Sequence, residues 1–315
     1  MPEVAITGIG IVSPFGIGKN IFYSSLQKKK PVHLEPLSEF HGTQLENYGV
    51  GSVADFKDAS KQFNRKHIKF MSTAALIGCL AGKEAADEAC ITERFAPHRI
   101  GIFSATGLTA ANISESREML EECMDEDGNF SEILFGEKGL PSLNPLNSFK
   151  ILPNIPPCIL SLILGVKGPN MIFNPWEDQA ACAILEGYKA VKEGEADCVL
   201  VGAADTPSSP PTVAYLKQQN ILGENSYPSS AGAYLVLESD ETAIKHHRKI
   251  YGIVKNIEVI CSAQKVYDPL SAVIGRTFAA APALFLAGAA MGITNNRQMI
   301  GTHGTRFEFS LEINK

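Results

Sequence analysis

The sequence predicts a layered α/β protein built around a parallel or mixed sheet. Near-continuous apolar runs, such as 99–103 and 197–202, indicate strands that are buried on both faces. Helical patterns alternate with these runs, as in 66–89 and 178–193. With 315 residues, 45% of them hydrophobic and 20% charged, the chain can bury a large core.

The expected elements follow one another in a regular order. Residues 4–7 form a β-branched run that ends in a glycine-rich turn, as a buried first strand would. The stretch 124–139 is acidic and contains glycine, so we expect an exposed loop there. The other expected elements are helices over 111–123, 242–247 and 278–291, strands over 233–238 and 250–254, and a half-buried last strand over 307–313.

Composition excludes several classes of function. A net charge of −6 and a pI near 5.7 provide no basic field for nucleic acid. The N-terminus lacks the basic start of a signal peptide, and no apolar run reaches the roughly 18 residues of a membrane span, so we expect a cytoplasmic protein. The seven cysteines are scattered without a CxxC pair, which favours reduced thiols and no metal site.

No cofactor is expected either. The first turn begins as Gly8-Ile9-Gly10, but Ser13 occupies the position of the third glycine of a dinucleotide fingerprint, and Pro14 follows it.

Several strings, in this order, resemble the β-ketoacyl-acyl-carrier-protein synthases of the thiolase superfold, and together they cover roughly residues 1–255. They are 4–16, 152–154 with 164–170, 194–197, 202–205 and 232–238. The resemblance implies a thiolase-like layered α-β-α-β-α fold. It divides the chain into a thiolase-like N-terminal half, 1–249, and a truncated C-terminal half, 250–315, because few residues separate Val254 from Val273.

The resemblance also locates the catalytic positions. Family enzymes carry a nucleophilic cysteine seven residues after the asparagine of Gly-Pro-Asn, at the start of a buried helix, and counting from Asn170 leads to Glu177. A carboxylate is a poor acyl carrier, because an acyl anhydride would hydrolyse. Cys182, the nearest thiol, is interpreted as a small buried helix residue.

The catalytic histidines are also replaced or displaced. The string 274–281 resembles the family's Gly-His motif, with Arg276 in place of the histidine, and a guanidinium cannot act as a general base. His303-Gly304-Thr305 looks like the other histidine motif, but it comes after Arg276, whereas the family order is the reverse. We interpret it as the glycine-rich turn before the last strand.

These substitutions predict no catalytic residue, with Glu177 and Arg276 as relict positions. The resemblance then implies a chain length factor of a type II polyketide synthase, possibly of the aryl-polyene type. Such a pseudoenzyme forms a heterodimer with a full-length catalytic ketosynthase and contacts acyl carrier protein through that complex. Two alternatives stay open: a malonyl-carrier-protein decarboxylase, and a non-catalytic scaffold that binds acyl carrier protein.

Three further site expectations follow. If the fold is kept, Glu177 and Arg276 should form a buried bidentate pair that fills the relict site. The helix over 111–123 resembles the one whose inner face gates chain length in related subunits, which implies tunnel candidates on one face by i, i+3, i+7 spacing: Asn112, Glu115 and Met119. The interface candidates are the residues just before Glu177: Phe173, Asn174, Pro175 and Trp176.

Overall fold

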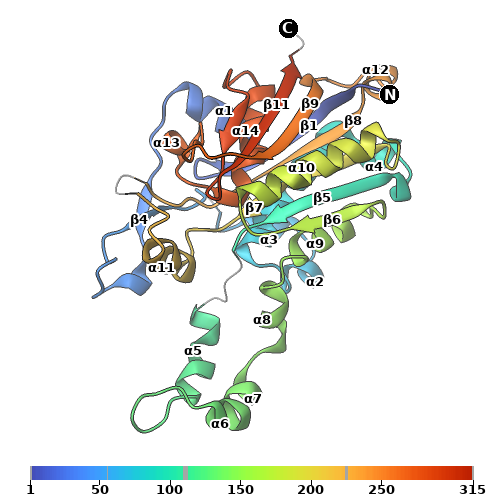
Figure 1. Cartoon of the computed structure of the whole chain (residues 1–315). Helices are drawn as coiled ribbons and strands as arrows, with labels where there is room; N and C mark the ends of the chain where they lie inside the picture. Colours follow the sequence, from blue (N-terminus) through green and yellow to red (C-terminus); the bar gives the residue numbers. More distant parts are fainter. Residues whose placement is uncertain (1, 55, 109–112, 224–225, 314–315) are drawn as a thin grey trace.

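The computed structural model of this protein describes residues 2–54, 56–108, 113–223 and 226–313, without the side chains of 113–115. Its centre is one nine-stranded mixed sheet in the order β10-β11-β9-β1-β8-β7-β5-β6, with β2 paired to β1 (Figure 1). The strands are β1 (Val4–Ser13), β2 (Gly16–Ile17), β5 (Ile100–Thr106), β6 (Asn170–Phe173), β7 (Cys198–Asp205), β8 (Ala231–Ser239), β9 (Gly252–Cys261), β10 (Gln298–Ile300) and β11 (Thr305–Glu312). A separate two-stranded sheet joins β3 (Leu34–Pro36) to β4 (Gly49–Gly51).

Helices cover both faces of the large sheet. On one face α3 (Thr73–Ala89) packs on β1, β8 and β7, and α9 (Ile155–Leu164) packs on α3. On the other, α10 (Glu177–Lys192) and α14 (Ala281–Ala290) lie against the central strands and also contact β11. The remaining helices are α1 (Lys19–Gln27), α2 (Arg65–Ile68), α4 (Ile91–Arg94), α5 (Ile113–Glu122), α6 (Glu132–Leu134), α7 (Leu140–Ser142), α8 (Pro145–Lys150), α11 (Pro210–Gln218), α12 (Asp240–Lys245) and α13 (Ser271–Ile274).

The pairing pattern explains why the buried runs were readable from the sequence. Strands β5, β6 and β7 are parallel to one another, whereas β8, β1, β9 and β11 pair antiparallel. Strands β1, β5 and β7 are buried along their whole length, so they show continuous apolar runs instead of alternation.

Close contact between β1 and α3 depends on two glycines. A Cβ atom at Gly8 would lie 2.2 Å from the Ala85 carbonyl oxygen, and one at Gly10 would lie 1.9 Å from that of Ala81. Any side chain at either position would push the helix off the sheet, so these glycines fix the distance between the two layers.

A buried ion pair joins α4 to β8. Arg94 donates from both terminal nitrogens to the Glu238 carboxylate, at 2.8 and 2.6 Å, and Glu238 is completely buried. Thr7 of β1 also donates to Glu238. Three elements distant in sequence therefore meet at one carboxylate.

A helical arm extends away from the sheet between β5 and α9 (Figure 1). It contains α5, α6, the π-helical turn η4 (Phe135–Gly139), α7 and α8. The expectation of a plain loop over 124–139 was wrong, because part of this stretch is helical and packs against α5 and α7. The helix expected over 66–89 is also interrupted: α2 ends at Ile68, and Ser72 caps α3 anew.

Two further observations complete the fold. The strands from residue 252 onward join the main sheet through the pairing of β9 with β1, over Val4–Ile6 and Gly252–Val254.

No helix in the described part of the chain is long and apolar enough to cross a membrane.

Candidate functional site

The candidate site is built on the first residue of α10. Glu177 follows Trp176, the N-cap residue, and its side chain is only 3% exposed. The helix therefore begins at the position that the sequence predicts for the family's nucleophile. The amide dipoles at a helix N-terminus favour a carboxylate there, as they would favour a thiolate.

Arg276 contacts Glu177 although the two residues are 99 positions apart in the sequence. Its Nη2 donates to Glu177 Oε1 at 2.8 Å, and the Arg276 side chain is 10% exposed. The expected meeting of the two side chains is therefore present. The expected bidentate geometry is not, because Nη2 alone contacts the carboxylate and Nε has no partner among the described residues.

Thr302 supplies hydrogen bonds to Glu177 in place of the second bond of a bidentate pair. It lies in the turn between β10 and β11, and its Oγ1 accepts from Arg276 Nη2 at 2.8 Å while donating to Glu177 Oε1 at 3.1 Å. The Thr302 backbone N–H donates to Glu177 Oε2 at 3.3 Å. The carboxylate is thus held by two segments that lie far from α10 in sequence.

Two further carboxyl groups lie close to this pair. Asp205, at the end of β7, is fully buried and accepts from the Ala279 N–H at 3.0 Å, while its other oxygen has no partner among the described residues. Burial, and secondarily the charge of Glu177, raises the pKa of Asp205 to about 8. Burial also raises the pKa of Asp268 to about 6, against the opposing effect of Arg276. Burial thus favours the protonated form of Asp205.

Aromatic side chains occupy the space around the pair. The Trp176 ring lies edge-on to Phe278 at 5.7 Å and to His303 at 5.0 Å, and the Arg276 guanidinium stacks over Phe278 at 4.7 Å. The two cavities that Asp205 lines have volumes of 30 and 10 Å³. Both volumes are far below that of a ligand pocket.

The other sequence candidates lie outside the ion pair, although His303 borders it through Trp176. Cys182 is half-buried within α10, and burial raises the pKa of its thiol, so it is poorly suited to attack a thioester. His303 lies in the turn between β10 and β11, as the sequence predicts. Asn112 lies outside the described residues, and the Glu115 side chain is also undescribed. Met119 faces Cys123 within the arm, with the two sulfur atoms 3.8 Å apart.

The interface candidates occupy the link between β6 and α10. Phe173 ends β6, opposite Ala105 of β5, and the Asn174–Pro175 peptide bond is cis. Trp176 points toward Phe278 and His303, so part of its ring surface is covered by this chain.

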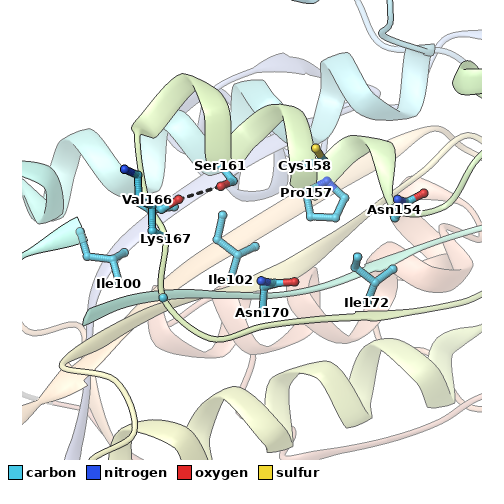
Figure 2. A pocket seen from close by; sticks show the side chains of 11 residues that line it. Ile100, Ile102, Asn154, Pro157, Cys158, Ser161, Val166, Lys167, Asn170 and Ile172 are labelled. Atoms are coloured by element: carbon cyan, nitrogen blue, oxygen red, sulfur yellow. Dashed lines mark hydrogen bonds between the residues drawn. The ribbon is translucent and has the colours of Figure 1, made fainter. Parts of the chain in front are cut away.

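A larger cavity lies on the other side of β6, away from Glu177. It has a volume of 290 Å³ and lies between α9 and strands β5 and β6 (Figure 2). Figure 2 shows Ile100, Ile102 and Ile172 along one side, and Cys158 on the helix above them. Strand β6 is the last strand of the sheet, so this cavity lies beside an unpaired strand edge.

Sequence reasoning missed three residues of the site. Thr302 stands directly before His303 and was not considered, although its neighbours were. Asp205 was noticed only within the string 202–205 that carries the family resemblance, and Asp268 was not noticed at all. Their roles depend on burial beside Glu177, which no local pattern reveals.

The mixed α/β sheet with helices on both faces is of the thiolase-like class of fold. The sequence profile of the Beta-ketoacyl synthase, N-terminal domain, matches residues 1–234. The chain therefore belongs to the β-ketoacyl synthase family.

Individual relatives are distant. The "Granaticin polyketide putative beta-ketoacyl synthase 1" of Streptomyces violaceoruber is 26% identical over 213 residues, which are 67% of this chain and 48% of that protein. The "3-oxoacyl-[acyl-carrier-protein] synthase 2" of Synechocystis sp. is 22% identical over 96% of this chain and 73% of its own length. The chain thus spans about half the length of the granaticin relative.

Solved structures agree on the fold. One chain of a solved complex aligns with this protein with a TM-score of 0.79 at 16% identity, over 100% of both chains. That structure is described as a type II PKS acyl-carrier protein in complex with its ketosynthase bound to the hexaketide. The ishigamide ketosynthase/chain length factor aligns with a TM-score of 0.77 at 15% identity, also over 100% of both chains.

Proposed function

We propose that this chain is a catalytically inactive ketosynthase-like subunit, of the chain length factor type, that pairs with an active β-ketoacyl synthase and shapes its acyl-chain tunnel. The observation that carries the proposal is the ion pair at the relict site. Where a family enzyme needs a free thiolate, Glu177 is held by Arg276 and Thr302. The carboxylate has neither the nucleophilicity nor the freedom to accept an acyl group.

The other catalytic requirement is also unmet. Condensation needs a base with an available lone pair, and Arg276 has none. The absence of a lone pair on Arg276 also argues against a malonyl decarboxylase, because Arg276 is already engaged with Glu177 and Thr302 instead of being free to face a thioester carbonyl.

An exposed strand edge supports pairing with another subunit. β6 pairs only with β5 in the described part of the chain, and Met171 on β6 and Leu162 on α9 are 44% and 62% exposed. The 290 Å³ cavity lies between the same two elements, where Asn170 and Ile172 of β6 face Ser161 of α9. A partner strand on this edge would satisfy the free backbone groups and cover the apolar side chains. Acyl carrier protein would reach the assembly through the ketosynthase.

Thiol footprinting tests this proposal. The chain is co-expressed with a full-length ketosynthase from its own gene neighbourhood, purified and treated with iodoacetamide. Cys158 is exposed and lines the cavity near β6, whereas Cys261 is exposed at the end of β9 and serves as the matched control. We expect protection of Cys158 alone in a 1:1 complex. Failure to form a complex, or equal labelling of both thiols with and without the partner, would contradict the proposal.

Activity measurements test catalytic silence. The Glu177→Gln variant should leave the condensation rate of the complex within about threefold, since no step passes through this side chain. Stoichiometric acylation of this chain, or carbon dioxide release from malonyl carrier protein by this chain alone, would refute silence. The tunnel role predicts that bulky apolar residues at Asn112 and Glu115 shift product length.

A further inference from the structure

The 290 Å³ cavity beneath α9 has the size of a small-molecule site. It lies between α9 and the strands β5 and β6 (Figure 2). The gap exists because α9 turns small side chains toward the strands at this point, namely Pro157, Cys158 and Ser161. An apolar cavity of about 150 Å³ is enough for benzene, so this one has room for a body of about ten carbon atoms.

The lining combines an apolar floor with free polar groups. Ile100 and Ile102 of β5 and Ile172 of β6 form the floor. Three exposed polar side chains surround it and have no hydrogen bond or ion pair with any other described residue: Asn154, Lys167 and Asn170. Apolar walls with a few convergent polar groups are typical of ligand sites.

The polar groups select the chemistry of the ligand. Lys167 is the one charged residue among the eleven that line the cavity, and none of the eleven is acidic. The Asn154 and Asn170 amides can each turn a further N–H donor toward a bound oxygen. The complement of this lining is an apolar body that ends in an anionic pair of acceptor oxygens, which is a carboxylate.

The backbone at Lys167 is held in place before any ligand arrives. The Lys167 N–H donates to the Pro97 carbonyl at 2.8 Å, and the Gly168 N–H donates to that of Ile100 at 3.0 Å. A Cβ atom at Gly168 would lie 2.4 Å from the Ile100 oxygen, so glycine lets this link lie directly on β5. Figure 2 shows Lys167 and Asn154 at opposite ends of the cavity. Little ordering of the backbone would therefore accompany binding.

We propose that this cavity binds a small monocarboxylate with an apolar body of about ten carbon atoms, the carboxylate on Lys167 and the body between the isoleucine floor and α9. The site is separate from the Glu177–Arg276 pair, which lies on the other side of β6. The proposal concerns the chain alone and does not rest on the proposed function.

Calorimetric titration of the chain with phenylbutyrate tests the proposal. We expect one bound molecule per chain, with a dissociation constant below about 1 mM. Phenylbutanol and phenylbutylamine have the same body, but one head is neutral and the other is cationic. Both should bind at least about fivefold more weakly, because neither forms the charge-assisted hydrogen bond to Lys167. Acetate, which has the head without the body, should not bind measurably.

Two variants with matched controls locate the ligand. Lys167→Gln should abolish the preference for phenylbutyrate over phenylbutanol and leave the affinity for the alcohol within about twofold, whereas Lys28→Gln, at an exposed cation on the end of α1, should change neither. Cys158→Phe fills the cavity and should weaken binding of both compounds at least about tenfold, whereas Cys261→Phe should not. Far-ultraviolet circular dichroism of every variant confirms that it is folded.

Thiol footprinting adds a readout in the wild-type chain. Phenylbutyrate should slow the reaction of Cys158 with iodoacetamide, because the bound body lies against this side chain, and should leave the reaction of Cys261 unchanged.

Several results would overturn the proposal. They are no binding of phenylbutyrate up to about 10 mM, equal binding of the amine, or a preference for the carboxylate that survives Lys167→Gln. Binding of several molecules per chain would also overturn it, since that indicates adsorption to exposed apolar surface. If a ketosynthase protects Cys158 but phenylbutyrate does not bind the chain alone, the cavity accepts a side chain of the partner, and this proposal fails while the proposed function stands.

Discussion

Replacing Arg276 with methionine removes the guanidinium and keeps an apolar stem of similar length. Glu177 would then retain only the Thr302 N–H and hydroxyl, at 3.3 and 3.1 Å, in a site that also holds Asp205. Removal of one partner of a buried ion pair leaves an uncompensated charge and costs about 3–5 kcal/mol of stability. We expect that loss for Arg276→Met, and a similar one for Glu177→Gln.

The double variant distinguishes this explanation from simple damage to the site. With both charges removed, neither member of the pair is left buried without its partner, and Thr302 can still donate to the glutamine oxygen. We expect a loss of only about 1 kcal/mol. The singles and the double should therefore depart from additivity by at least about 2 kcal/mol, toward a double variant that is more stable than the sum predicts.

Urea unfolding, followed by circular dichroism, measures each free energy. A second cycle at Arg117 and Glu121 provides the control, because those side chains are paired at 2.6 Å but are 75% and 63% exposed. It should show no measurable coupling. Single substitutions at Glu177 or Arg276 that cost less than about 1 kcal/mol, or costs that simply add, would refute the account of a desolvated pair.

Three more predictions follow from buried groups. Arg94→Met should cost at least about 3 kcal/mol in urea unfolding, because it leaves the Glu238 carboxylate buried without a cation, and a cost below about 1 kcal/mol would contradict this. Iodoacetamide should label Cys158 and Cys261 before Cys182, as read by peptide mass spectrometry; early labelling of Cys182 would contradict its raised thiol pKa. Burial raises the pKa of Asp205 to about 8, so the folded chain keeps a proton that the unfolded chain releases near pH 4. Stability should therefore fall by up to about 1.4 kcal/mol per pH unit between those values, and Asp205→Asn should remove that slope; an unchanged slope would show that another group causes it.

The sequence was most informative where spacing is rigid. Glu177 could be located because Asn170 and Gly194 bracket the start and end of one helix, and the structure has α10 over Glu177–Lys192 between them. Its meeting with Arg276 was predictable because the family's two catalytic positions converge on one pocket. The turn at His303 was predictable because an alternating strand follows it directly.

Sequence reasoning failed where the outcome depends on tertiary contact. The acidic stretch 124–139 looked like a loop, but its short helices form by packing on α5 and α7. The pair at Glu177 was expected to be bidentate, but Thr302 supplies two of the contacts from a turn about 125 residues away. The pKa of Asp205 depends on complete burial, which the string Gly202-Ala203-Ala204-Asp205 does not encode.

If the chain is the inactive subunit proposed above, the Glu177–Arg276 ion pair at the start of α10 also bears on how easily it could regain catalytic activity. Glu177→Cys alone would place a thiol beside an unpaired Arg276, with no base and with Trp176 and Phe278 still filling the space. Under the proposed function, reversal of either substitution alone would leave one charge of the pair buried without its partner and would restore no activity, so each single reversal is penalised.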